Sequence, residues 1–172
     1  EYERLHSAER FRLGKLRKAR EGHVVTSQAP YGYDYIPKQG GKHGYYKINE
    51  AEAEVIKMIF SWVGEKGFTI RKVILELKKL DIKPKSSERG VWSSSTLTRL
   101  LHNQTYIGIA HFNRTKAIVP KKPLLEKKYK RITKTSRIIR DPEKWISIYV
   151  PAILDKGLFG RVQKQLDQNS QR

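Results

Sequence analysis

Three segments between residues 49 and 103 repeat the pattern of an amphipathic helix, and they constrain the fold more than any other feature. In each segment, apolar side chains recur every three or four residues, as on one face of a helix. Asn49, Thr69 and Ser93 stand where helix N-caps are expected, and Glu52 is in position to complete a capping box with Asn49. The expected inward residues are Val55, Ile56, Ile59, Phe60 and Val63, then Ile70, Val73, Ile74, Leu77 and Leu80, then Leu97, Leu100 and Leu101. These patterns predict a compact cluster of three helices.

The flanking segments predict further helices and some short strands. Residues 1–20 predict a long basic helix with a thin apolar stripe, which ends before Gly22. Alternating aromatic and polar positions predict two strands around a turn at Gly40-Gly41, and residues 106–112 and 146–150 predict two more. Asp155 is a candidate cap for a last helix. The sequence therefore predicts an α+β fold: a long N-terminal helix, three clustered helices, a small antiparallel sheet, a basic hairpin and a C-terminal helix.

Charge narrows the choice of partner. The chain carries 36 Lys and Arg residues against 17 Asp and Glu, a formal net charge of +19. Such an excess destabilises a compact monomer unless a polyanion neutralises it. No apolar run approaches the ~20 residues of a membrane helix, and no segment is a clean basic amphipathic helix. We therefore expect a nucleic acid as partner and no membrane.

Catalytic and metal-binding patterns are missing from the sequence. The chain has no cysteine, and its five histidines follow no ligand spacing. It contains no Gly-rich phosphate loop, no HExxH motif and no GxSxG motif. We expect no catalytic residue, no metal and no cofactor in this chain.

The third predicted helix is a candidate for reading DNA. If its leucines face the core, Ser95, Thr98, Arg99 and His102 point outward, and such side chains suit a major groove. The alternative is a short surface helix that only closes the core. Residues 81–93 also form a much longer connection than the usual three- or four-residue turn of a helix-turn-helix motif.

Two basic segments are candidates for phosphate contacts. Residues 114–140 hold eleven Lys and Arg residues and one acid, interleaved with aliphatic residues, which favours a hairpin along phosphates over a solvated charge run. The first helix offers a second basic surface. The alternative interpretation is again that its charges are simply exposed to solvent. The candidate residues are Lys15, Arg17, Lys18, Arg20, Arg114, Lys116, Lys121, Lys122, Lys127 and Lys128. The tyrosines of Pro30-Tyr31-Gly32-Tyr33 are expected to pack on the core and not to stack on bases.

Short motifs follow one another in a fixed order along nearly the whole chain. They are Glu9-Arg10, Gly14-Lys15, Ala19-Arg20-Glu21-Gly22, Pro30-Tyr31-Gly32-Tyr33, Ile48-Asn49-Glu50-Ala51-Glu52, Ile59-Phe60, Gly67-Phe68-Thr69, and residues 92–97, 100–108, 151–154 and 159–166. In this order and spacing they resemble the recombinase DNA-binding domain of large serine recombinases, the integrases and transposon recombinases of phages and mobile elements.

The resemblance implies a division of the chain. Residues 1–21 would end the long helix that comes from a catalytic domain before Glu1, and 22–47 would be a linker with short strands that crosses a minor groove. Residues 48–167 would form the DNA-binding domain with its basic hairpin at 114–140, and 168–172 a frayed tail. The chain would then be a fragment, and a cysteine-containing zinc domain and a coiled coil commonly follow in the family.

The resemblance also implies an activity for the parent protein. A serine of the catalytic domain would attack a DNA phosphate, and subunits in a tetramer would exchange strands. The implied partners are double-stranded DNA and other recombinase subunits, in the bacterial cytoplasm at the nucleoid. The alternative is a freestanding regulator or an RNA-binding module, which would lack an upstream domain with a serine nucleophile.

Overall fold

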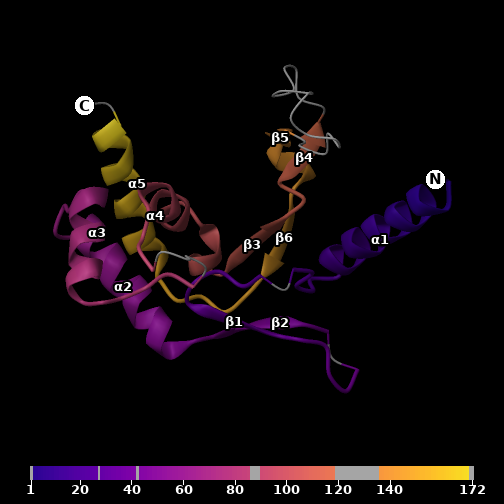
Figure 1. Ribbon diagram of the computed structural model, residues 1–172, viewed down its shortest axis with the longest axis horizontal. Coiled ribbons are helices and arrows are strands. Elements are labelled where there is room, and N and C mark those ends of the chain that lie inside the picture. Colours follow the sequence, from indigo (N-terminus) through magenta and orange to yellow (C-terminus); the bar gives the residue numbers. More distant parts are fainter. Residues whose placement is uncertain (1, 27, 42, 86–89, 119–135, 171–172) are drawn as a thin grey trace. The chain divides into compact units, whose positions relative to one another are not determined.

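The predicted helices lie together in the larger of two units in the computed structural model (Figure 1). The structure describes residues 2–26, 28–41, 43–85, 90–118 and 136–170. Residues 23–110 and 149–172 make up the helical unit, and residues 1–22 and 111–148 make up the second unit. Within the described residues, no helix is both long enough and apolar enough to cross a membrane.

Helix α2 (Glu50–Gly64) begins where its cap predicts. The side chain of Asn49 accepts a hydrogen bond from the Glu52 backbone N–H at 3.3 Å. The second half of the capping box is absent, because the Glu52 carboxylate accepts from the N–H of Gly32 at 2.8 Å. The predicted stripe is buried except for the half-buried Val55, and Trp62 is buried beside it. The first turn of α2 is therefore bonded, through Glu52, to the chain segment that precedes the first strand.

Helices α3 (Ile70–Lys79) and α4 (Ser94–Leu101) also start at their predicted caps. Thr69 accepts from the Lys72 N–H, and Ser93 accepts from the Thr96 N–H. Val73 and Leu77 are buried, whereas Leu80, expected to face inward, is 54% exposed because α3 ends before it. The helical cluster predicted from the sequence is therefore confirmed, with one position at its edge corrected.

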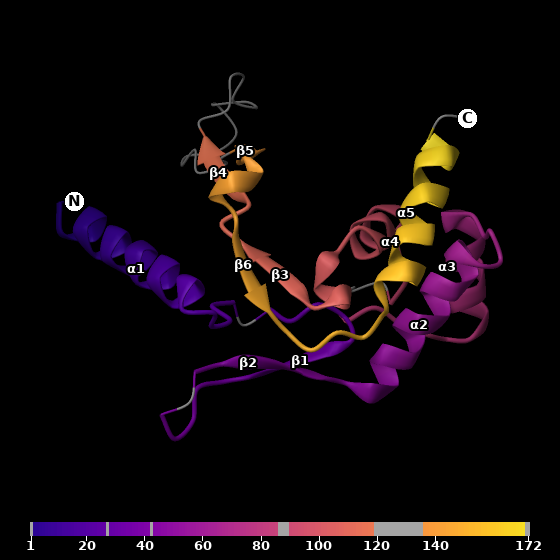
Figure 2. The same ribbon diagram turned by 180° about the vertical axis from the view of Figure 1, so that it is seen from behind.

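Helix α5 (Lys156–Ser170) packs on α2, and both are seen together in Figures 1 and 2. Asp155 accepts from the Leu158 N–H at 2.9 Å, as its predicted capping role requires. The rings of Phe60 and Phe159 stack with centroids 5.9 Å apart. A Cβ on Gly64 would lie 2.8 Å from Val162, so this glycine permits the close approach of the two helices. The helix continues to Ser170, beyond the expected start of the tail.

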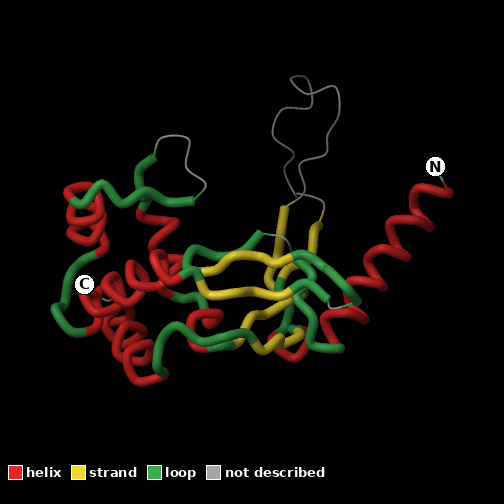
Figure 3. Tube along the Cα trace, turned by 90° about the horizontal axis from the view of Figure 1, so that it is seen from below, coloured by secondary structure: helices red, strands yellow, loops and turns green. Residues whose placement is uncertain are grey.

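Strands β1 (Tyr33–Ile36) and β2 (Tyr45–Ile48) form the predicted antiparallel pair, drawn in yellow in Figure 3. Tyr33 pairs with Ile48 in register, and its ring is fully buried. Its hydroxyl donates to the carbonyl oxygens of Thr105 and Pro151, at 2.9 and 2.7 Å. The tyrosines of this segment therefore pack on the core, as expected.

Strand β3 (Ile109–Phe112) pairs with β6 (Ile146–Tyr149), but it starts later than the sequence predicts. Gln104–Ile107 form a 3₁₀ turn, which replaces the expected first residues of the strand. The Asn103 side chain accepts from the Thr105 N–H, and Gly108 has a φ of 92°, so the backbone turns before it extends.

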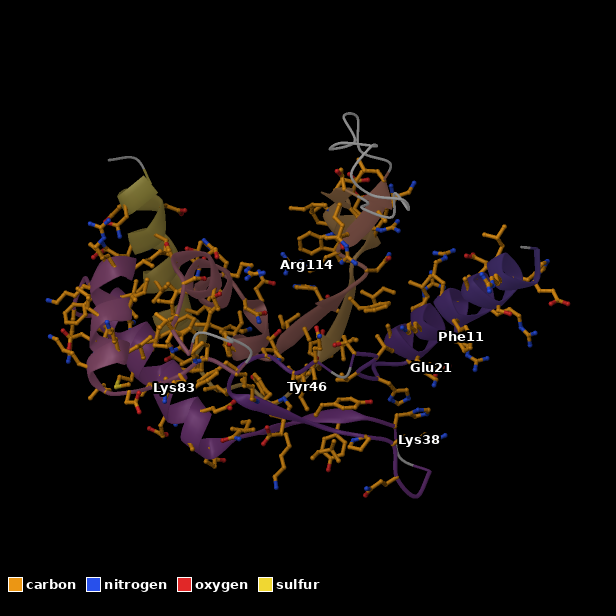
Figure 4. The ribbon with its side chains drawn as sticks, viewed as in Figure 1. Phe11, Glu21, Lys38, Tyr46, Lys83 and Arg114 are labelled. Carbon is orange, nitrogen blue, oxygen red and sulfur yellow. The ribbon has the colours of Figure 1, made fainter. Side chains whose placement is uncertain are left out.

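The second unit contains α1 (Tyr2–Arg20) and the hairpin of β4 (Thr115–Ile118) and β5 (Ser136–Ile139). The predicted hairpin is confirmed at its root, where Thr115 pairs with Ile139. Its expected tip, between the two strands, lies outside the described residues. On α1 the expected stripe is poorly buried: Leu5 is 71% exposed, and only Ala19 is buried. Phe11, labelled in Figure 4, is also 75% exposed.

Candidate nucleic-acid interface

Helix α4 presents a polar face opposite its buried leucines. Leu97, Leu100 and Leu101 are buried in the core of the helical unit. Ser95, Arg99 and His102 are exposed, and Thr98 is half-buried. At about 100° per residue, these four positions fall within about 100° of one another around the helix. The structure thus brings all four predicted residues together on one face, and their contact with DNA stays a prediction.

Several of these side chains are bonded along the helix itself. The Arg99 Nε donates to the backbone oxygen of Ser95 at 3.3 Å, and the Thr98 hydroxyl donates to that of Ser94 at 2.9 Å. The hydroxyls of Ser93 and Ser95 lie 3.1 Å apart. A hydroxyl that donates along the helix keeps its acceptor lone pairs, and an arginine that donates through Nε keeps its terminal N–H groups. The face therefore offers both donors and acceptors in held positions.

His102 is held from a neighbouring helix. Its Nδ1 lies 2.6 Å from the Oε1 of Gln163 on α5. The Nε2 of Gln163 donates to the backbone oxygen of Leu101 at 2.8 Å. Gln163 therefore ties the end of α4 to α5. The sequence gives no signal for this contact, because periodicity predicts faces of helices and not polar pairs between them.

The long connection before α4 is anchored at two points. Trp92 is buried, and its Nε1 donates to the backbone oxygen of Ile82 at 2.9 Å. The Lys85 ammonium lies 2.8 Å from the Glu52 carboxylate and donates to the backbone oxygen of Tyr33 at 2.5 Å. The Lys85 contacts attach the connection to α2 and β1, and the Trp92 bond joins the two ends of the connection to each other. The connection before α4 is longer than the usual turn of a helix-turn-helix motif, but its described residues make defined contacts with their surroundings.

The basic residues predicted on α1 do not form one face. Lys15, Arg17, Lys18 and Arg20 are all exposed near the end of the helix. At about 100° per residue, Lys15 and Lys18 lie on one side, and Arg17 and Arg20 lie on another. Arg17 is also 3.7 Å from the Glu21 carboxylate, an exposed pair that contributes little stability. One duplex backbone could therefore meet only part of this set.

The root of the hairpin combines basic side chains with one tryptophan. The Arg114 guanidinium lies over the Trp145 ring, 4.9 Å from its centroid, and Arg114 is labelled in Figure 4. The Trp145 Nε1 donates to the backbone oxygen of Arg140 at 2.8 Å. Burial, and then the charge of Arg114, lower the pKa of His111. Arg114 and Lys116 are both exposed, so they are available to an anion.

Four lysines of the hairpin were also predicted to contact phosphates. Lys121, Lys122, Lys127 and Lys128 lie outside the described residues. Over the residues that are described, no group of three His, Cys, Asp or Glu side chains is placed to hold a metal ion.

Two solved structures share the fold of this chain at 21% sequence identity. One is the crystal structure of an LSR–DNA complex, with a TM-score of 0.58, covering 94% of this chain and 42% of that one. The other, concerned with the sequence requirements of the Listeria innocua prophage attP site, has a TM-score of 0.56 and covers 92% and 52%. This chain therefore spans about half, or less, of the chains that it matches. No curated protein matches its sequence.

A family model places the chain more firmly. The model named Recombinase matches residues 50–169, which extend from the start of α2 to the last turn of α5. The match covers more than half of the chain and includes α4 with its polar face. This chain is a member of the Recombinase family.

Proposed function

We propose that this chain is the DNA-binding part of a site-specific serine recombinase, and that it holds and reads half of an attachment site. The observation that carries the proposal is the family match from α2 to α5, which includes the polar face of α4. The shared fold with a chain from an LSR–DNA complex and the net charge of +19 both support DNA as the partner.

In this proposal α4 reads bases in the major groove. A guanidinium such as that of Arg99 can donate to the two acceptors of guanine, and Ser95 and Thr98 can bond with bases or phosphates. Their positions on one helix face, fixed by the buried leucines behind them, allow simultaneous contact with one groove. The helix is short, but a recognition helix needs only a few side chains at base edges.

The second unit supplies phosphate contacts in the same proposal. Arg114 and Lys116 at the hairpin root, the lysines of the hairpin, and one side of the basic end of α1 would neutralise phosphates. Such contacts hold and orient a protein without reading sequence. Specificity would then come from α4 and affinity mainly from the second unit.

We propose the following division of the chain within its parent protein. Residues 1–21 would lead from a catalytic domain, 22–47 would connect, 48–167 would bind DNA, and 168–172 would form the tail. The serine nucleophile would belong to the catalytic domain, and other recombinase subunits would complete the assembly. With DNA as its partner, the protein would work in the bacterial cytoplasm.

The test is binding without cleavage. The purified chain is expected to shift duplex DNA in a gel and to enrich one half-site from a pool of randomised duplexes. Supercoiled plasmid is expected to remain intact, because no catalytic group was found in the sequence. Duplex RNA of matched length is the control, because it tests the alternative that the chain is an RNA-binding module. Preference for RNA, or binding with no enrichment of any sequence, would contradict the proposal.

A further inference from the structure

The side chain of Gln163 decides which hydrogen bonds His102 can offer. Gln163 lies on α5 and reaches the end of α4, two helices that stand side by side in Figures 1 and 2. Its amide makes two contacts there: Nε2 to the backbone oxygen of Leu101 at 2.8 Å, and Oε1 to the Nδ1 of His102 at 2.6 Å.

The chemistry of these contacts fixes the orientation of the amide. A backbone carbonyl oxygen can only accept, so the Gln163 atom that faces Leu101 must be the amide nitrogen. The amide oxygen then faces His102, and an amide oxygen can only accept as well. The Nδ1 of His102 must therefore carry the proton of this hydrogen bond.

A neutral imidazole has one N–H, so a proton on Nδ1 leaves a lone pair on Nε2. His102 is exposed and lies on the same face of α4 as Ser95 and Arg99. Its Nε2 is thus a hydrogen-bond acceptor on the proposed reading face. A DNA phosphate has only acceptors and cannot bond to it, whereas the exocyclic amino groups of bases donate.

We propose that His102 determines specificity by accepting a hydrogen bond from the exocyclic amino group of a base, and that Gln163 is the positioning residue that holds it in the required tautomer. This inference rests on the proposed function, because it assumes that α4 reads duplex DNA. Two amino groups are exposed in the major groove, on adenine and on cytosine, and guanine exposes one in the minor groove.

The first test measures the tautomer in the full chain without DNA. Long-range ¹H–¹⁵N spectra at about pH 8.5, above the ordinary pKa of histidine, distinguish the two nitrogens. Nδ1 is expected to be protonated in the wild type. Gln163→Met, which keeps the length of the side chain and removes both amide contacts, is expected to shift the proton towards Nε2. Gln165→Met, on the same helix, is the matched control, because the Gln165 amide donates to Asn169 of α5 itself at 3.4 Å.

The second test uses the half-site that the chain selects. Each adenine, cytosine or guanine is replaced in turn by an analogue that lacks the amino group: purine, 2-pyrimidinone or hypoxanthine. One replacement is expected to weaken wild-type binding by roughly 3- to 10-fold, the effect of one hydrogen bond. The same replacement should cause no further loss in His102→Ala or Gln163→Met, and an unchanged loss in Gln165→Met.

The outcomes separate the inference from the function on which it rests. A proton on Nε2 in the wild type, or an analogue effect that persists in His102→Ala and Gln163→Met, would overturn the inference while DNA binding remained intact. Failure of the wild-type chain to select any duplex would overturn the proposed function itself. If Gln163→Met does not fold, His102→Ala still decides the matter, because His102 is exposed and its truncation should leave the fold intact.

Discussion

The ammonium group of Lys85 lies 2.8 Å from the carboxylate of Glu52, and this ion pair attaches the connection before α4 to the first turn of α2. The Glu52 side chain is only 18% exposed, and it also accepts from the Gly32 N–H. The same ammonium reaches the backbone oxygen of Tyr33. One lysine therefore joins the connection, a helix and a strand, and it does so from a position that no local pattern singles out.

Lys85→Met is expected to lower the free energy of unfolding by about 1–3 kcal/mol, because it leaves a half-buried carboxylate with one partner fewer. Urea denaturation measures the change. Lys83→Met is the control: its ammonium is 3.5 Å from Asp81 and both side chains are exposed, so the loss should stay below about 0.5 kcal/mol. Equal losses in the two variants would show that the Lys85 pair contributes no more than an exposed one.

Buried tyrosines predict a loss of stability in alkali. Burial raises the pKa of Tyr33, Tyr46 and Tyr106 above the ordinary value of 10.0. In the unfolded chain these phenols lose their protons near pH 10, while the folded chain retains them. Above about pH 10 the unfolded state therefore binds fewer protons than the folded state. The contribution of these tyrosines to the free energy of unfolding is complete below about pH 10, and it falls as pH rises by at most about 1.4 kcal/mol per pH unit for each tyrosine.

Tyr33→Phe tests this origin of the pH dependence. The variant is expected to lose about 1–3 kcal/mol at neutral pH, because the carbonyl oxygens of Thr105 and Pro151 lose a donor. It should also show a shallower fall in stability above about pH 10 than the wild type, since one titrating group is gone. Tyr149→Phe, at an 83% exposed position, should leave the slope unchanged. Urea titrations between about pH 8 and pH 11 measure both quantities.

The sequence predicted what depends on neighbours along the chain. Asn49, Thr69 and Ser93 were predicted as caps because each is a capping residue type directly before an apolar helical pattern. In the structure each side chain accepts a hydrogen bond from the N–H three residues later. The inward leucines of α4 were found because helical periodicity determines a face. With one face buried, the outward position of Arg99 followed directly.

The sequence did not predict what depends on distant segments. Glu52 was expected to return to its own cap, but folding brings the Gly32 N–H and Lys85 to it. The strand expected from residue 106 begins at Ile109, because Asn103 and Gly108 favour a tight turn before it. The contact between Gln163 and His102 joins two helices, and neither helix alone contains a signal for it.

Arg99→Ala should separate reading from holding. The variant is expected to lose about 1–3 kcal/mol of binding free energy on the selected half-site and clearly less on random duplex, because the proposed base contact would be lost while most phosphate contacts would remain. Arg71→Ala, an exposed arginine of α3, is the charge-matched control and should weaken both duplexes by similar small amounts. Fluorescence anisotropy measures the dissociation constants of each variant for both duplexes, and their ratio gives the specificity. Equal losses on the two DNAs for Arg99→Ala would remove α4 from the reading role.

The basic hairpin should determine much of the salt dependence of binding. Each phosphate contact contributes about −0.9 to the slope of log K against log salt. The fourfold change of Lys121, Lys122, Lys127 and Lys128 to Ala is expected to flatten the slope by up to roughly 3–4 units, on specific and random DNA alike. The charge-matched control changes four exposed lysines of the helical unit to Ala: Lys57, Lys66, Lys72 and Lys79.

A salt titration of both fourfold variants decides between two uses of the hairpin. If the hairpin instead contacts other recombinase subunits, its variant keeps the wild-type slope, and assembly of the parent protein on DNA fails. An unchanged slope would therefore contradict phosphate contact by these four lysines.

The helical unit is discontinuous in sequence: it is interrupted after Ala110 and resumes at Tyr149. The two ends of the interruption are adjacent, because the Val150 N–H donates to the Gly108 carbonyl at 3.0 Å beside the pairing of β3 and β6. The entropy cost of closing such an excursion grows only with the logarithm of its length. Insertions, deletions or exchange of the segment between β4 and β5 should therefore cost the helical unit little. The phosphate contacts that we propose for this segment could then change in evolution while the scaffold of α4 stays the same.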